Sequence, residues 1–302
     1  MTARWPRMLA MLLCLASPAL AQTPPAAPGT TAADVAGLRA RLDALDAMIF
    51  DPAATFSASK TLEDLRLVEG EIGSRAELAR ERKQVLHLIG IVEYKRGDME
   101  AARDALLQSL AIDTGDPVTE RIVRDHYLVA GIAADQEDYD LAIAHYRSAA
   151  DLADGVPGLT DDEKAGIREK LGYVLHEAKR YQDALAVNTG VLATGERLFG
   201  ADSPKLMTVL TNLAQNAHAL GRPGEAEAYL QRCRGIARAS GDVEKEQDML
   251  FQLGVLAFET GQPAAARTYM KDRIKLLAAA NEPDLLDAAK QDYAELLRRL
   301  GK

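Results

Sequence analysis

Small and apolar residues recur along the chain with a period of about 40 residues. Five segments, the first starting at Leu88 and the last at Gln252, align without a gap, and their successive starts are 40, 42, 42 and 40 residues apart. An apolar column is followed at once by glycine or alanine, at Gly90, Ala130, Gly172, Ala214 and Gly254. Twelve residues further on, every segment has alanine, at Ala102, Ala142, Ala184, Ala226 and Ala266. Small residues at two fixed places let two antiparallel helices approach closely, so the pattern predicts a series of helix pairs.

The residues between the two small columns are typical of a turn. They read Lys-Arg-Gly-Asp at 95–98, Leu-Gly-Arg-Pro at 220–223 and Thr-Gly-Gln-Pro at 260–263. Glycine ends many helices, and proline is tolerated at the first helical position because its missing N–H has no partner there. Each unit is therefore predicted to be a helix, a turn and a second helix, and the fold class to be all-α.

These units resemble tetratricopeptide repeats, and the long spacing and residues 196–233 are most similar to repeats of the kinesin light chain type. The resemblance implies a right-handed superhelical solenoid of five repeats over residues 83–302, with a C-terminal capping helix. The family's leading large apolar position is occupied by His126 and Arg168 in the second and third units, and the family's terminal proline is absent. We expect looser packing or a polar contact at those two positions.

Amphipathic patterns are found before the repeats and at the C-terminus. Apolar residues three or four apart, which are typical of helices, occur at Val35, Leu38, Leu42, Leu45 and Ile49, and then at Leu62, Leu65, Val68 and Ile72. These two helices are expected to form an N-terminal capping region over residues 33–82, with a short coiled coil as the alternative. Residues 284–300 match the first helix of a sixth unit and are expected to cover the apolar face of the fifth.

The first residues predict export. Arg4 and Arg7 precede a short apolar run that ends in Ala-Leu-Ala at 19–21, as in a secretory signal peptide cleaved after Ala21. Residues 1–21 are thus the predicted signal peptide, 22–32 a disordered tether, and the location periplasmic or secreted. Lipid attachment at Cys14 is disfavoured by the bulky Leu13 before it. Cleavage removes two arginines and no acids, so the formal charge changes from -9 to 34 minus 45, or -11.

No set of residues predicts catalysis, a metal site or a cofactor. The five histidines are His87, His126, His145, His176 and His218, and none has a neighbouring cysteine or the spacing of a zinc site. Cys233 occupies a position where the family prefers alanine, which favours a buried, unreactive thiol. The net negative charge argues against nucleic acid as a partner, and no segment after the signal has the length of a membrane span.

The expected site is the face formed by the first helices of the units. Residues that the repeat positions on this face are His87, Tyr94, Tyr127, Glu169, Tyr173, His176, Glu177, Gln215, His218, Phe251, Phe258 and Glu259. Aromatic rings beside acids suit a peptide with apolar and basic side chains, so the predicted function is a non-enzymatic scaffold that binds a protein or peptide. The lysine and asparagine with which some relatives grip a terminal carboxylate are absent. A self-assembling subunit and a solenoid that binds a glycan or small molecule are the alternatives, and homo-oligomerisation stays open.

Overall fold

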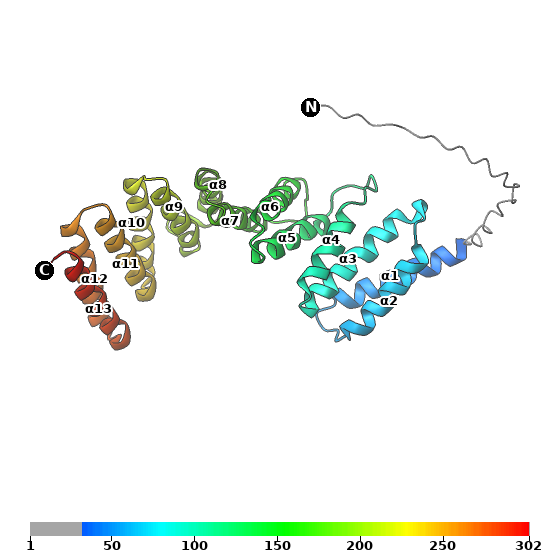
Figure 1. The fold of residues 1–302 in the computed structure, drawn as a ribbon, viewed down its shortest axis with the longest axis horizontal. Coiled ribbons are helices and arrows are strands. Elements are labelled where there is room, and N and C mark those ends of the chain that lie inside the picture. The colour runs from blue at the N-terminus through cyan, green and yellow to red at the C-terminus, as the bar shows by residue number, and fades with distance from the viewer. Residues whose placement is uncertain (1–31, 302) are drawn as a thin grey trace, which may run out of the picture.

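The computed structural model describes residues 32–301, and every regular element in that range is helical. Thirteen α-helices follow one another along an extended array (Figure 1). They are α1 (Ala32–Phe50), α2 (Ala58–Ile72), α3 (Ala79–Arg96), α4 (Met99–Leu110), α5 (Glu120–Asp135), α6 (Tyr139–Ala153), α7 (Asp161–Glu177), α8 (Tyr181–Phe199), α9 (Met207–Ala219), α10 (Pro223–Ser240), α11 (Val243–Glu259), α12 (Pro263–Ala280) and α13 (Pro283–Arg299). Two short 3-10 helices, η1 (Ala76–Leu78) and η2 (Pro204–Leu206), precede α3 and α9.

The helices from α3 onward form five antiparallel pairs and a final single helix. Each helix packs against the next one along the chain, and α1 also contacts α3. The units are α3 with α4, α5 with α6, α7 with α8, α9 with α10, and α11 with α12, and α13 packs on α12. This arrangement confirms the predicted all-α solenoid of helix–turn–helix repeats with a C-terminal helix. None of the described helices combines the length and apolarity needed to cross a membrane.

The two small columns lie where the paired helices meet. The five column alanines, from Ala102 to Ala266, are all fully or almost fully buried. A Cβ at Gly90 would lie 2.6 Å from Cγ of Leu106 on the partner helix, and one at Gly254 would lie 2.9 Å from Cε of Met270. These glycines let a larger side chain of the second helix lie directly over the first helix. The small residues of the repeat pattern therefore mark where the two helices approach closely.

The turn within each unit needs one residue with a positive φ. Gly97, Gly221 and Gly261 have φ values of 89°, 70° and 72° in the first, fourth and fifth units. In the second and third units the same place is occupied by Glu137 and Lys179, both with φ of 60°. A side chain in this left-handed conformation costs free energy that glycine avoids.

The N-terminal helices share one apolar core with the first unit. Buried residues of α1 and α2, among them Leu42, Ile49 and Leu65, join those of α3 in a single cluster. The helix α3 begins at Ala79, ahead of the boundary at residue 83 that the sequence suggested. The predicted signal peptide and all but the last residue of the predicted tether lie outside the described residues.

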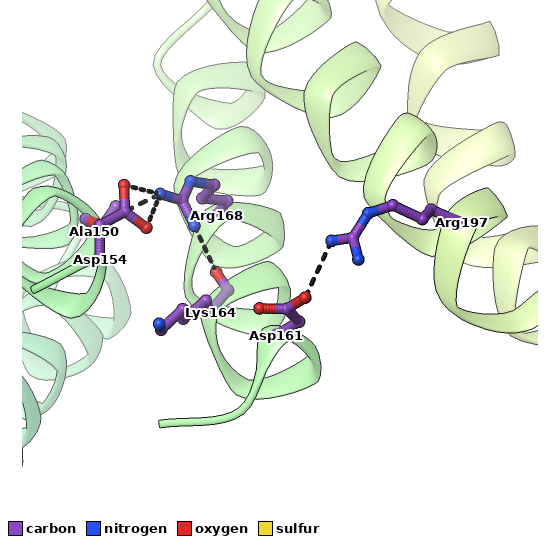
Figure 2. Close-up of polar contacts among 6 residues, drawn as sticks. All are labelled: Ala150, Asp154, Asp161, Lys164, Arg168 and Arg197. Carbon is purple, nitrogen blue, oxygen red and sulfur yellow. Dashed lines mark hydrogen bonds and ion pairs between the residues drawn. The ribbon is translucent and has the colours of Figure 1, made fainter. Parts of the chain in front are cut away.

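Polar contacts replace apolar packing at the two positions where the repeat pattern is broken. Nδ1 of His126 on α5 lies 3.0 Å from Nδ1 of His145 on α6. Figure 2 shows Arg168 of α7 reaching both carboxylate oxygens of Asp154, at 2.7 and 2.8 Å, and the carbonyl of Ala150 at the end of α6. The sequence-based expectation of a polar contact at each position is therefore confirmed.

Candidate functional site

The largest hollow described lies between the first helices of the second, third and fourth units. Its volume is about 550 Å3, and it opens between α5, α7 and α9. Tyrosines, carboxylates and basic side chains line it together with smaller groups: Glu120, Val123, Arg124, Tyr127, Leu159, Glu163, Gly166, Ile167, Glu169, Lys170, Tyr173, Thr208 and Asn212. This is the central hollow. Its lining mixes aromatic surface with charged and hydrogen-bonding groups, as binding sites do.

A second hollow, of about 230 Å3, adjoins the central hollow and shares Tyr127, Lys170 and Tyr173 with it. It extends to Tyr94 on α3 and to Tyr146 on α6. The rings of Tyr127 and Tyr146 pack edge to face with their centres 5.4 Å apart. Tyr94 and Tyr173 are 41% and 52% exposed, respectively. The two hollows form one trough, here named the central groove, that presents two exposed tyrosines to solvent.

A separate pair of hollows lies near the C-terminus. Their volumes are about 180 and 240 Å3, and both are lined by Phe251, Val255 and Glu259 of α11. Nε2 of His218 on α9 lies 3.2 Å from a carboxylate oxygen of Glu259 and links two neighbouring units. This C-terminal groove is smaller than the central groove.

The charges of the central hollow are unequally compensated. Arg124 donates to Glu120 at 2.7 Å within α5. Glu163 accepts from the backbone N–H and hydroxyl of Thr160, both at 2.8 Å, and these hydrogen bonds lower the pKa of its carboxyl. Glu169 has neither a hydrogen bond nor an ion pair among the described residues. Burial raises the pKa of Glu169, and the nearby positive charge of Lys170 offsets this rise only in part.

The structure divides the sequence-predicted site residues between the two grooves. Tyr94, Tyr127, Glu169 and Tyr173 line the central groove. The C-terminal groove contains the other aromatic and polar positions, namely Gln215, His218, Phe251, Phe258 and Glu259.

Two further predicted residues lie between the grooves and line neither. Nδ1 of His176 is 2.8 Å from Oδ1 of the buried Asn216, and its ring packs edge to face on Tyr181. Glu177 is exposed at the end of α7. The histidine therefore connects the third unit to the fourth.

The prediction that His87 lies on the partner-binding face is wrong. Its side chain is only 1% exposed and cannot contact a partner there. Its Nδ1 lies 2.6 Å from Oδ1 of Asp125 on the next unit, and its ring stacks on Phe50 of α1. The repeat pattern does not encode the packing of α1, which is why the sequence did not reveal this burial. His87 instead borders a hollow of about 440 Å3 at the junction of α3, α4 and α5.

Several lining residues of the central hollow were missed by sequence reasoning. Arg124 and Lys170 precede the tyrosines Tyr127 and Tyr173 by three residues, and Thr208 and Asn212 lie on α9 two turns and one turn before the predicted Gln215, respectively. Residues three or four apart share a helix face. Extending each groove column by two turns toward the start of its helix would have found these residues.

The surroundings of the cysteine and the histidines do not form a metal site among the described residues. Cys233 is fully buried, as expected, and burial raises the pKa of its thiol. Within residues 32–301, no three histidine, cysteine or acidic side chains come together in a group that could hold a metal ion.

Comparisons with known proteins agree on the fold. Residues 163–239, in the third and fourth units, match the family model described as tetratricopeptide repeat. The crystal structure of BtubC (BKLC) from P. vanneervenii is similar at a TM-score of 0.53, with 20% identity over 79% of this chain and 93% of that one. The apo form of RapI is similar at a TM-score of 0.50, with 16% identity over 88% of this chain and 99% of that one. No curated protein matches the chain. The protein is thus an all-α solenoid of tetratricopeptide-like repeats.

A third similar structure also has TPR-like repeats. It is a putative kinesin light chain from Podosopora anserina with nearly identical TPR-like repeats, and its TM-score is 0.49. The identity is 16%, over 68% of this chain and 97% of that one.

Proposed function

We propose that this protein is a non-enzymatic scaffold that binds a partner protein or peptide on the first-helix face of its repeats. The observation that carries the proposal is the central groove, in which Tyr94 and Tyr173 present exposed aromatic rings side by side with polar and charged groups. Exposed rings that line a hollow can bury a large area against a partner, and such rings often supply much of the binding energy.

The test of this proposal removes both exposed rings. Because the side chains of Tyr94 and Tyr173 make no hydrogen bond in the described structure, a Tyr94→Ala, Tyr173→Ala variant should keep its helicity. Partner capture by the purified protein from the cells that produce it should fall at least tenfold. A Lys271→Ala variant, changed at an exposed position of α12, is the matched control. Capture that survives the loss of both tyrosines would contradict the proposal.

We also propose that the protein acts in the periplasm or outside the cell. The basis is the signal-like sequence of residues 1–21, with its two arginines, its apolar run and Ala-Leu-Ala before Gln22. Mass spectrometry of the protein from its own cells should find a mature chain that begins at Gln22. A chain that retains Met1, or one with a lipid on Cys14, would contradict this.

A further inference from the structure

We infer that the central hollow takes a basic side chain, an arginine or a lysine, of the bound partner, and that Glu169 recognises its charge. This inference rests on the proposed function, because it names the chemistry of the group that enters the same groove. The volume of about 550 Å3 lies within the range of roughly 300–1,000 Å3 found for ligand pockets. The hollow therefore has room for a long side chain and the backbone next to it.

Glu169 is the group in the hollow that needs a partner. Its carboxylate is partly buried, and no described residue donates a hydrogen bond to it or pairs with it. A carboxylate that loses water without gaining a donor is destabilised, and a cation or N–H donor from outside restores what was lost.

The other charged side chains of the hollow do not pair with Glu169. Glu120 is engaged with Arg124, and Glu163 with Thr160 at the start of α7. The lining holds three carboxylates against Arg124 and Lys170, so its formal charge is negative. Lys170 is exposed and lines both hollows of the central groove; its charge attracts Glu169, but the two side chains form no ion pair in the described structure. An acidic side chain from a partner would add to the negative charge, whereas a basic one would offset it.

The remaining lining groups suit a cation. Tyr127 and Tyr173 offer aromatic rings, whose faces attract ammonium and guanidinium groups. Thr208 and Asn212 on α9 provide a hydroxyl and an amide oxygen that can accept hydrogen bonds from such groups. The hollow thus combines one unpaired carboxylate, two rings and neutral acceptors from three successive units.

The experiment uses random heptapeptides displayed on phage and selected on the purified protein. The selected peptides should be enriched in arginine or lysine at one position. A synthetic peptide from this set should bind at least tenfold more weakly when its basic residue is replaced by methionine. The Glu169→Gln variant should weaken binding of the original peptide by a similar factor. The methionine peptide and the Glu169→Gln variant together should bind little more weakly than when only one of the two is changed, because each change removes the same contact.

Three controls keep the outcome unambiguous. Glu244→Gln removes the same charge from an exposed position of α11 outside the hollows and should leave binding unchanged. Glu169→Asp should keep part of the affinity, and circular dichroism should show that each variant is folded. Peptides that lack basic enrichment and bind the Glu169→Gln variant normally would overturn the inference but not the proposed function. A selection that yields the same basic peptides on the Tyr94→Ala, Tyr173→Ala variant would overturn the proposed function and, with it, this inference.

Discussion

The second and third units differ from the fourth and fifth in how closely they follow the repeat pattern. The fourth and fifth turn on Gly221 and Gly261, and their second helices open with Pro223 and Pro263. The second and third reach the same turn with Glu137 and Lys179 in a left-handed conformation, at a cost in stability.

The packing between paired helices shows the same contrast. Met270 in the fifth unit fills the space over Gly254 of the partner helix, and Leu230, at the matching position of the fourth unit, is buried. In the third unit the matching residue of the second helix is Asn188, which lies against Gly172 and is fully buried. Neither the oxygen nor the nitrogen of its side-chain amide has a hydrogen-bond partner.

These departures lie in the units that form most of the central groove. Locally unfavourable residues are common near functional sites, where a sequence serves more than stability. The comparison therefore teaches that the regular units contribute stability, whereas the irregular units supply the surface with the most varied chemistry.

Placing a buried asparagine in the regular fourth unit should have the largest effect on the free energy of unfolding. Leu230→Asn removes a buried apolar side chain and leaves a buried amide in its place. Both effects destabilise, and together they should lower the free energy of unfolding by about 3 kcal/mol. Urea unfolding followed by circular dichroism measures the change. A loss below about 1 kcal/mol would show that this position tolerates an amide in any unit.

The reverse change should stabilise the third unit. Asn188→Leu replaces two unpartnered polar atoms with a side chain of the kind that Leu106 places over Gly90 in the first unit. The free energy of unfolding should rise by about 1–2 kcal/mol, with a higher Tm. An unchanged or lower Tm would mean that the amide has a partner in solution, such as a bound water.

The histidine pair of the second unit should make stability depend on pH. Burial and the neighbouring His145 lower the pKa of His126 to about 4, and burial also lowers the pKa of His145. The ordinary value is about 6.5, so between these limits the unfolded chain binds more protons than the folded chain. Stability is therefore fully present above pH 6.5 and is lost as the pH falls toward 4.

Allowing for solvent screening, the free energy of unfolding should fall by about 1 kcal/mol between pH 7 and pH 5. Urea unfolding at the two pH values measures this. Lys83 also acts on His126, so the control changes the imidazole alone. In His126→Leu, which restores the apolar residue of the repeat pattern, the part of this dependence due to His126 should vanish and that due to the buried His145 should remain. An equal dependence in the variant would assign it to other groups.

The turns should give the smallest effect. Glu137→Gly and Lys179→Gly relieve the left-handed side chains, although glycine also makes the unfolded chain more flexible. Each should raise the free energy of unfolding by about 0.5 kcal/mol. Gly221→Ala and Gly261→Ala should lower it by about 1 kcal/mol. Thermal unfolding of the four variants measures both signs, and similar shifts in all four would contradict the contrast between units.

The repeat pattern predicted the helix pairs well because each unit repeats the same local constraints. Gly90 and Ala102, for example, need only their own helix pair to explain their positions. The burial of His87 could not be predicted, since it depends on Phe50 of α1 and Asp125 of the next unit, which no repeat position encodes. The central hollow was found only in part, because its lining comes from three successive first helices and two turns of each.

Site-specific photo-cross-linking shows which face of the solenoid contacts the partner. A photoreactive phenylalanine analogue is placed either at Tyr173, in the central groove, or at Ala193, which is exposed on the second helix of the same unit. The two proteins are then irradiated in the cells that produce them. If the first-helix face binds the partner, position 173 should yield a cross-linked partner and position 193 none or far less. Cross-linking from position 193 alone would show that the opposite face binds the partner and would contradict the account.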